Sequence, residues 1–284
     1  MNTRHFSQLP KPYLAYPKVI QGLIFKKPKG EKVLPQVEYV VDTLKIDSKH
    51  LESYNEICGF KNDGVVPAIY LAVLSQSLQM HMMTSEAFPF PILGLVHIRN
   101  QIKQIRNIGV NEQIMLSCKF GELKPHDKGL QFDFITTAKV AGEVVMESLT
   151  TYLSRQKTEK KAGEKAKDTQ EPAYQPQAEW NISENTGRRY ALISGDFNLI
   201  HIHAVTAKAF GFKQAIAHGM WSKAKALASI ELPAAYEADV WFKLPMYLPS
   251  TVEFLTAAES KQTDFLIRNV KSKKPHVAGT VKAL

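Results

Sequence analysis

A charged segment, Arg155–Glu171, is the feature that most limits how this chain can fold. It reads RQKTEKKAGEKAKDTQE and contains no large apolar side chain. Such a segment cannot bury a face of its own, because folding needs apolar surface to offset the loss of chain entropy. A chain of 284 residues is long enough for two domains. The sequence therefore predicts two folded halves, residues 1–154 and 175–284, joined by a charged linker at 155–174.

The first half combines one long helix with several strands. Residues 68–83 carry apolar side chains at helical spacing without an internal Pro or Gly, which predicts a largely buried helix over Ala68–Met83. Alternating β-branched and polar residues predict a strand at Val37–Ile46. Further strands are expected at Leu93–Arg99, Gln113–Phe120, Leu130–Lys139 and Val144–Ser154. One helix followed by antiparallel strands is typical of an α+β fold.

The second half repeats this order in outline. Ser183 is a candidate N-cap for a short helix that ends near Ile193, and a second short helix is predicted at Ala204–Phe210. A longer helix begins near Gly219. Strands are expected at Asp239–Leu244, Thr251–Ala258, Thr263–Lys271 and Val277–Leu284. The sequence identity between the halves is too weak to indicate a repeat by itself.

Charge and cysteine content exclude several classes of protein. The formal charge is +9, spread as +3 (17 − 14) over residues 1–154, +2 (6 − 4) over 155–171 and +4 (13 − 9) over 172–284. This spread favours solvated surface lysines over a nucleic-acid site. Two cysteines, Cys58 and Cys118, exclude a disulfide-rich scaffold and a Cys-rich zinc module. The most apolar stretch, Val65–Met83, is interrupted by polar residues, so we expect no membrane span. No secretory signal is recognisable near Met1, and we expect a cytoplasmic protein.

Potential acid–base chemistry is concentrated between Tyr190 and His201. Asp196 and His201 are five residues apart, and Gly195 permits a sharp turn just before them. A carboxylate and an imidazole that reach one water molecule can shuttle its protons. The competing interpretation is a structural one, because Asp and Asn beside Gly commonly form Asx-turns.

A second motif, Ile216–Met220, opens the long helix of the second half. A helix that starts with Gly presents unpaired backbone N–H groups that a substrate carbonyl oxygen can approach closely. As a bare motif it is weak, because many helices begin this way.

Taken together, the segments SGDFNLIH, Ala207, AFGF and IAHGM resemble the hydratase-2 signature of the MaoC-like dehydratase and (R)-specific enoyl-CoA hydratase family. The resemblance covers about residues 175–284, whereas the first half resembles the motif-free half of two-domain members in outline only. It implies a double hot dog, in which two antiparallel sheets each wrap around a central helix. On this basis residues 1–154 form a degenerate hot-dog domain and residues 175–284 form the catalytic one.

The resemblance implies a lyase of acyl-thioester (fatty acid) metabolism, which reversibly hydrates trans-2-enoyl-CoA to (R)-3-hydroxyacyl-CoA. Asp196 and His201 would jointly activate one water, and Asn198 would hold the water or the loop. The backbone N–H of Gly219 would form the oxyanion site. No cofactor is implied beyond the coenzyme A or acyl carrier protein that forms part of the substrate. Leu199 replaces the Pro that usually follows the Asn in this family, which leaves the loop freer.

Three alternatives stay open at this point. The same site could act as a hydroxyacyl-ACP dehydratase, which changes only the carrier. The chain could instead be a non-catalytic acyl-thioester-binding scaffold, a reading that Leu199 makes more plausible, or a thioester hydrolase on the same fold. The sequence is also compatible with a homodimer.

Several other residues are assigned supporting or lining roles, with alternatives. His201, His203 and His218 suggest a metal cluster, but no Cys or second carboxylate accompanies them, so no metal is predicted. His203 is expected as a polar neighbour of the site. Aromatic residues nearby, Phe212 among them, either line an acyl tunnel or form plain core, and core is favoured. The residues assigned a supporting or lining role are Ser194, Gly195, Phe197, Phe210, His218 and Trp221.

Overall fold

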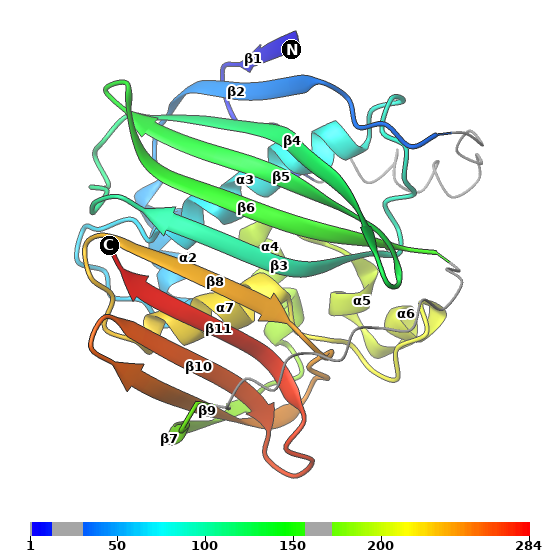
Figure 1. Ribbon diagram of the computed structural model, residues 1–284, viewed down its shortest axis with the longest axis vertical. Coiled ribbons are helices and arrows are strands. Elements are labelled where there is room, and N and C mark those ends of the chain that lie inside the picture. Colours follow the sequence, from blue (N-terminus) through cyan, green and yellow to red (C-terminus); the bar gives the residue numbers. More distant parts are fainter. Residues whose placement is uncertain (1, 13–30, 157–171) are drawn as a thin grey trace.

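The computed structural model describes residues 2–12, 31–156 and 172–284, so most of the predicted linker lies outside the described residues. Eleven strands form one continuous sheet in the order β1-β2-β4-β5-β6-β3-β8-β11-β10-β9-β7. The helices lie on one side of this sheet (Figure 1). The strands of the N-terminal half form the upper part of the sheet in this view, and those of the C-terminal half form the lower part. The α+β double hot dog expected from the sequence is the observed architecture.

Within the described residues, the N-terminal half supplies six strands and two helices. Strand β1 pairs in parallel with β2 at one edge, and the other neighbouring strands pair antiparallel. Helix α3 has the bounds expected from its apolar spacing. The elements are β1 (Asn2–Phe6), β2 (Val37–Leu44), α2 (Ser48–Cys58), α3 (Ala68–Met83), β3 (Leu95–Gln104), β4 (Ile114–His126), β5 (Gly129–Val140) and β6 (Glu143–Arg155).

The C-terminal half supplies five strands and four helices. Three of its helices are short, and all of them precede the four strands that end the chain. The elements are β7 (Gln175–Ile182), α4 (Thr186–Ser194), α5 (Leu199–Ile202), α6 (Ala204–Ala209), α7 (Gly219–Ala228), β8 (Tyr236–Phe242), β9 (Ser250–Glu259), β10 (Gln262–Asn269) and β11 (Pro275–Ala283).

Several local predictions need correction. Ser183 does not cap α4: its hydroxyl donates to the side chain of Asn185, and Asn185 occupies the N-cap position. Helix α2 was missed, although Asp47 caps it and Leu51, Tyr54 and Cys58 have helical spacing. Strands β1 and β7 were also missed, because both are edge strands with mostly exposed residues and no alternating apolar pattern.

The two halves meet where β3 pairs antiparallel with β8, from Arg99 opposite Trp241 to Gln104 opposite Tyr236. Side chains reinforce this pairing. Arg99 and Asp239 form an ion pair with Nη2 and Oδ2 2.7 Å apart, and Gln101 Nε2 donates to Glu237 Oε1 at 2.6 Å. The backbone groups at these edges are thereby satisfied within the molecule.

Lys223 is fully buried beneath the junction of β3 and β8. Its ammonium donates to the Asn100 carbonyl oxygen at 2.9 Å, to Asn100 Oδ1 at 2.7 Å and to the Ala238 carbonyl oxygen at 3.3 Å. Burial lowers the pKa of Lys223 well below its usual range. A lysine of one half is thus held by both strands that join the halves.

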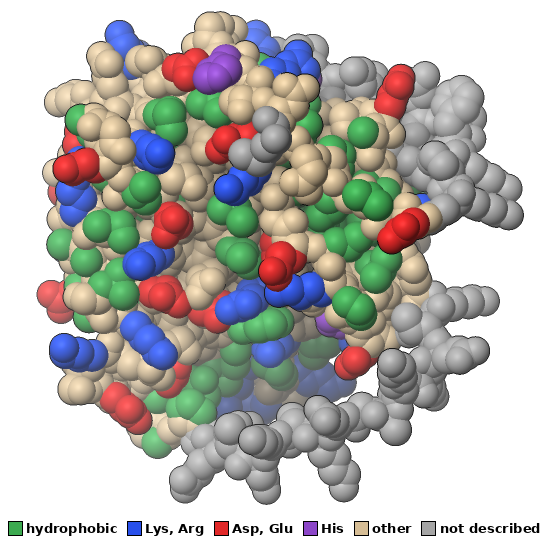
Figure 2. All heavy atoms as spheres, turned by 45° about the horizontal axis from the view of Figure 1, so that its top comes forward, with side chains coloured by type: hydrophobic (Ala, Val, Ile, Leu, Met, Phe, Trp, Pro, Cys, Tyr) green, Lys and Arg blue, Asp and Glu red, His purple; other side chains and the backbone are tan. Residues whose placement is uncertain are grey.

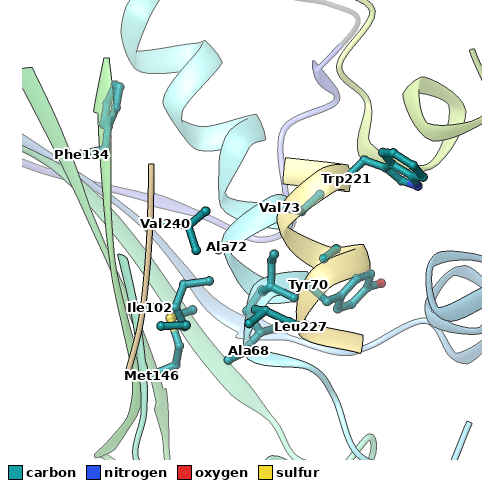
Figure 3. Close-up of a cluster of buried hydrophobic side chains, with 14 of the residues drawn as sticks. Ala68, Tyr70, Ala72, Val73, Ile102, Phe134, Met146, Trp221, Leu227 and Val240 are labelled. Atoms are coloured by element: carbon teal, nitrogen blue, oxygen red, sulfur yellow. The ribbon is translucent and has the colours of Figure 1, made fainter. Parts of the chain in front are cut away.

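The core lies between the sheet and helices α3 and α7. Figure 3 shows Ala68 and Ala72 of α3 and Leu227 of α7 facing Ile102 and Val240 of the sheet. Helix α3 is apolar around most of its circumference, as expected for a helix buried on several sides. Among the helices of the described residues, none has the length and apolarity that a membrane span requires.

The surface in Figure 2 carries intermixed Lys, Arg, Asp and Glu side chains. Ion pairs such as Arg106 with Glu112 and Arg268 with Glu253 contribute to this mixture. A nucleic-acid site of the usual kind needs basic side chains gathered on one face. The face shown therefore matches the distributed charge seen in the sequence.

Candidate active site

The segment from Ser194 to His201 connects two short helices and carries the acid–base pair. Helix α4 ends at Gly195, whose φ of +75° is a left-handed conformation that L side chains rarely adopt. Pro12 of the N-terminal segment packs on this glycine, since a Cβ there would lie 2.7 Å from Pro12 Cγ. Glycine is therefore required at 195 for both its backbone angle and its lack of a side chain.

Both oxygens of the Asp196 carboxylate accept hydrogen bonds. Oδ1 accepts from the Asn198 N–H at 3.1 Å, and Oδ2 accepts from Gln76 Nε2 at 2.9 Å. Burial acts to raise the pKa of Asp196, but the neighbouring His218 and His201 and these hydrogen bonds outweigh it, so that the pKa is lower than usual. Asp196 is therefore a carboxylate at neutral pH.

His201 is held in a single tautomer. Its Nδ1 lies 2.8 Å from the Ile216 carbonyl oxygen, which can only accept, so Nδ1 carries the proton and Nε2 presents a lone pair. Burial lowers the pKa of His201 although Asp196 acts in the opposite direction, and the imidazole is neutral at neutral pH. Gly187 of α4 allows this placement, because a Cβ there would collide with the His201 carbonyl oxygen.

His218 completes the polar cluster from the other side. Its Nε2 donates to the Asp196 carbonyl oxygen at 3.0 Å, and its ring stacks on that of His201 with centroids 3.7 Å apart. Burial lowers the pKa of His218 to about 3, and the adjacent His201 adds to this effect. Its buried Nδ1 has no hydrogen-bond partner among the described residues.

Asn198 and Leu199 start the one-turn helix α5. Asn198 Oδ1 accepts from the Ile200 N–H at 3.4 Å and forms the N-cap, so this residue holds the loop through its side chain as well as its backbone. Leu199 is the first helical residue and is exposed. That is the position where helices favour Pro, since its N–H has no partner within the helix. The replacement of Pro by Leu thus leaves the helix and its cap in place.

Two expectations about the histidines need correction. His201 and His203 were considered as alternate residues of a strand, but they belong to a helical turn and its end, so they face different ways. His203 is exposed and caps α6 by accepting from the Val205 N–H, so its ring is turned to the start of that helix. The group with a geometry that could hold a metal ion is Asp196, His201 and His218, with ligand atoms within 4.8 Å of one another. That no metal acts here stays a prediction.

The supporting residues divide into two groups. Ser194 lies in the site, where its Oγ accepts from the Asp196 N–H at 3.2 Å. Trp221 belongs to the core, and its Nε1 donates to the Ile57 carbonyl oxygen of the other half at 3.0 Å. Phe197, Phe210 and Phe212 are half-buried. The core interpretation therefore holds for Trp221 and not for the three phenylalanines.

Gly219 is the first residue of α7, and its N–H has no acceptor within that helix. His218 immediately before it binds the Asp196 carbonyl, so the helix start and the acid–base pair are held together. A Cβ at 219 would lie 3.0 Å from two ring carbons of Phe242. A side chain at this position would therefore crowd both the N–H and the aromatic ring beside it.

Three residues beside Asp196 were not predicted from the sequence, and all come from the motif-free half. Gln76 of α3 binds Asp196 directly. His97 of β3 and Tyr152 of β6 stack with ring centroids 5.0 Å apart, and both are close enough to Asp196 for its charge to affect their pKa values. Their sequence neighbourhoods carry no motif, so the signal that finds them is tertiary contact.

Known proteins resemble this chain both in sequence and in fold. The model of the MaoC like domain matches residues 164–280. The 3-hydroxyacyl-thioester dehydratase X of Mycobacterium tuberculosis (strain ATCC 25618 / H37Rv) is 33% identical over 254 residues, covering 88% of this chain and 91% of that protein. The chain belongs to the MaoC-like dehydratase family. It is an enzyme of the hydro-lyase class.

Solved structures extend the likeness to the fold. The crystal structure of HtdX from M. tuberculosis aligns with a TM-score of 0.76 and 32% identity, covering 87% of this chain and 100% of that one. The MaoC-like dehydratase of Phytophthora capsici gives 0.71 at 20% identity, covering 89% and 97%. An M. tuberculosis protein described as a double hotdog gives 0.58 at 9% identity, covering 93% and 97%. The last two show the fold alone.

Proposed function

We propose that this protein catalyses the reversible hydration of trans-2-enoyl-CoA to (R)-3-hydroxyacyl-CoA. One observation carries the proposal: an ionised Asp196 and a neutral His201 with a free Nε2 lone pair lie within 4.8 Å of each other. Two proton acceptors at this spacing can hold one water molecule between them. The related M. tuberculosis protein is named as a dehydratase of 3-hydroxyacyl thioesters, which supports the substrate class.

The protonation states suggest how the water is used. His201 Nε2 accepts a proton from the water as its oxygen forms a bond to C3, and the C2–C3 π electrons move toward the thioester carbonyl. The Asp196 carboxylate stabilises the resulting imidazolium. The imidazolium then returns the proton to C2, which gives the hydroxyacyl product and restores the neutral imidazole. Dehydration follows the same steps in reverse.

The N–H of Gly219 is proposed as the donor for the developing enolate oxygen. It lies at the start of α7, where unpaired backbone donors and the helix dipole both favour negative charge. Phe242 packs against the glycine and limits access from its side. This arrangement gives the thioester oxygen a donor that needs no reorganisation during the reaction.

The proposed substrate carrier is coenzyme A, whose phosphates suit a chain with a formal charge of +9. The cytoplasm is proposed as the compartment, since Cys58 and Cys118 are buried free thiols, which suits a reducing environment. The monomer is taken as the working unit, because its own two halves supply all of the site residues named above.

The experiment is a hydration assay with crotonyl-CoA and longer trans-2-enoyl-CoAs, following the loss of conjugated-enoyl absorbance and the chirality of the product. Asp196→Asn and His201→Ala serve as active-site controls. We expect (R)-3-hydroxyacyl-CoA from the wild type. Formation of the (S) product, or release of free CoA without hydration, would contradict the proposal. Turnover of enoyl-ACP with no turnover of any enoyl-CoA would assign the carrier to acyl carrier protein.

A further inference from the structure

The two halves of this chain are joined in the active site by one hydrogen bond to a reacting group. Gln76 lies on α3, the long helix of the half that lacks the signature, and is separated from Asp196 by 120 residues. Its Nε2 donates to Asp196 Oδ2 at 2.9 Å. The other oxygen of that carboxylate is taken by the Asn198 N–H within its own loop. Each half thus contributes a donor to this carboxylate.

A glutamine is well suited to this position for electrostatic reasons. Its amide is neutral at every pH at which the protein is folded, so it can donate to a carboxylate without titrating itself. A hydrogen bond to an ionised acceptor is stronger than one between neutral groups. The Gln76 side chain is half-buried, and the Asp196 side chain that its amide reaches is 22% exposed. The bond therefore lies at the inner end of the Gln76 side chain, next to the site.

The other polar groups around Asp196 do not replace this donor. His201 of α5 and His218 before α7 are neutral, and their bonded nitrogens donate to backbone carbonyl oxygens. His97 of β3 lies between Tyr152 and Phe242, and its Nε2 bonds the Arg99 carbonyl oxygen. Tyr152 binds Gln79, and Tyr190 packs against the His218 ring. Of the neighbours named here, Gln76 is the one whose side chain donates a hydrogen bond to the carboxylate.

We infer that Gln76, which belongs to the motif-free half of the same chain, is a positioning residue for the Asp196 carboxylate of the other half. It keeps Asp196 ionised and fixes Oδ2 relative to His201. The inference rests on the proposed function for its kinetic consequences, and it adds a role for the N-terminal half. Without Gln76, Oδ2 would lose this donor, while the Asn198 N–H would still hold Oδ1 within the loop.

The chain offers a matched control. Gln101 is also half-buried and also donates, at 2.6 Å, to a carboxylate of the other half, Glu237. That bond lies on the sheet between β3 and β8 and does not touch Asp196. Gln76→Leu and Gln101→Leu therefore each remove one glutamine–carboxylate bond between the halves. Gln76→Glu and Gln101→Glu each place a second carboxylate beside the first.

The test combines kinetics with a direct measurement of Asp196. The pH profile of kcat/KM is recorded for all variants on the enoyl-CoA that the wild type hydrates best. The titration of the Asp196 carboxyl carbon is followed by NMR in protein labelled at aspartate, with Asp196→Asn for assignment. Gln76→Leu should raise the pKa of Asp196 and lower kcat/KM about tenfold near neutral pH, with the acidic limb of the profile moved to higher pH. Gln76→Glu should raise the pKa of Asp196 further, since a second negative charge beside it disfavours ionisation.

The Gln101 variants should change thermal stability without moving either the profile or the Asp196 titration. Equal effects of Gln76→Leu and Gln101→Leu on stability, with an unchanged Asp196 titration, would overturn the inference and leave Gln76 as a structural tie. If Gln76→Leu does not fold, the isosteric Gln76→Glu decides by the same titration. If the wild type hydrates no thioester, the proposed function fails, and the NMR titration alone still accepts or rejects the role of Gln76.

Discussion

The N-terminal and C-terminal halves place their strands in the same order. In the first half five strands follow the order β2-β4-β5-β6-β3 across the sheet, and in the second the order is β7-β9-β10-β11-β8, so each of these five strands has a counterpart five labels later. The edge strand β1 has none. Taking β2 and β7 as the first of these five strands in each half, a central helix follows it, α3 in one half and α7 in the other. The repeat that sequence identity did not reveal is therefore present in the topology.

The halves differ in what lies between the first strand and the central helix. The first half has the single helix α2 there, and the second has α4, α5 and α6 with the loop that carries Asp196 and His201. The central helices differ as well: α3 has 16 residues and α7 has 10, beginning at Gly219. One half thus has a long packing helix, while the other has the acid–base loop and a helix start next to it.

The largest expected effect on turnover distinguishes the two segments that precede the central helices. Asp196→Asn or His201→Ala should lower kcat by about 10²–10⁴-fold, because each removes a general acid–base group. His50→Ala is the counterpart in the first half: His50 also bonds a backbone carbonyl, that of Ile193, at 2.9 Å. We expect it to keep turnover close to wild type in a steady-state assay. A comparable loss in His50→Ala would show that the halves are not functionally distinct.

The next effect concerns the two central helices. Gly219→Val should lower kcat/KM by about 10²–10³-fold, the usual cost of losing an oxyanion donor, because the side chain blocks the approach to the N–H. Since the new Cβ also meets the Phe242 ring, part of the change could be structural. Combining Gly219→Val with Phe242→Leu should restore thermal stability and leave activity low. Recovery of activity together with stability would argue that Gly219 serves packing alone.

The connection between the halves can be tested at Lys223. Lys223→Met should reduce the free energy of unfolding by about 1–3 kcal/mol, because buried acceptors on Asn100 and Ala238 lose their donor. Lys225→Met is the control on the same helix, where the ammonium lies over the Trp180 ring instead. Chemical denaturation of both variants makes the measurement. Equal stabilities would mean that strand pairing alone holds the halves together.

The last prediction concerns the acid sensitivity that the buried His218 of the C-terminal half confers on folding. The pKa of His218 is about 3 in the folded protein and 6.5 for an ordinary histidine. Between these values the unfolded chain binds the extra proton, so stability should fall as pH drops from about 6.5 toward 3. Urea denaturation across this range should show the slope, and His218→Gln should reduce it. A wild-type unfolding free energy that does not change over this range would contradict the buried, neutral state of His218.

The sequence alone determined the elements whose signals are local. Helix α3 was predicted with its observed bounds, because its apolar residues and the lack of an internal Pro or Gly are properties of neighbouring positions. The signature segment was found in the same way, since Asp196, Asn198 and His201 lie within six residues. The family and the enzyme class followed from that segment, and the comparisons confirm both.

Only the tertiary structure decided how the site is held. The bond from Gln76 to Asp196 spans 120 residues, that from Lys223 to Asn100 spans 123, and that from His218 to Asp196 spans 22. No local pattern encodes such contacts: the first two depend on how the halves join at β3 and β8, and the third on how the loop packs against the start of α7. The protonation states of Asp196 and His201 also follow from burial and hydrogen bonding, which exist only after the halves have packed.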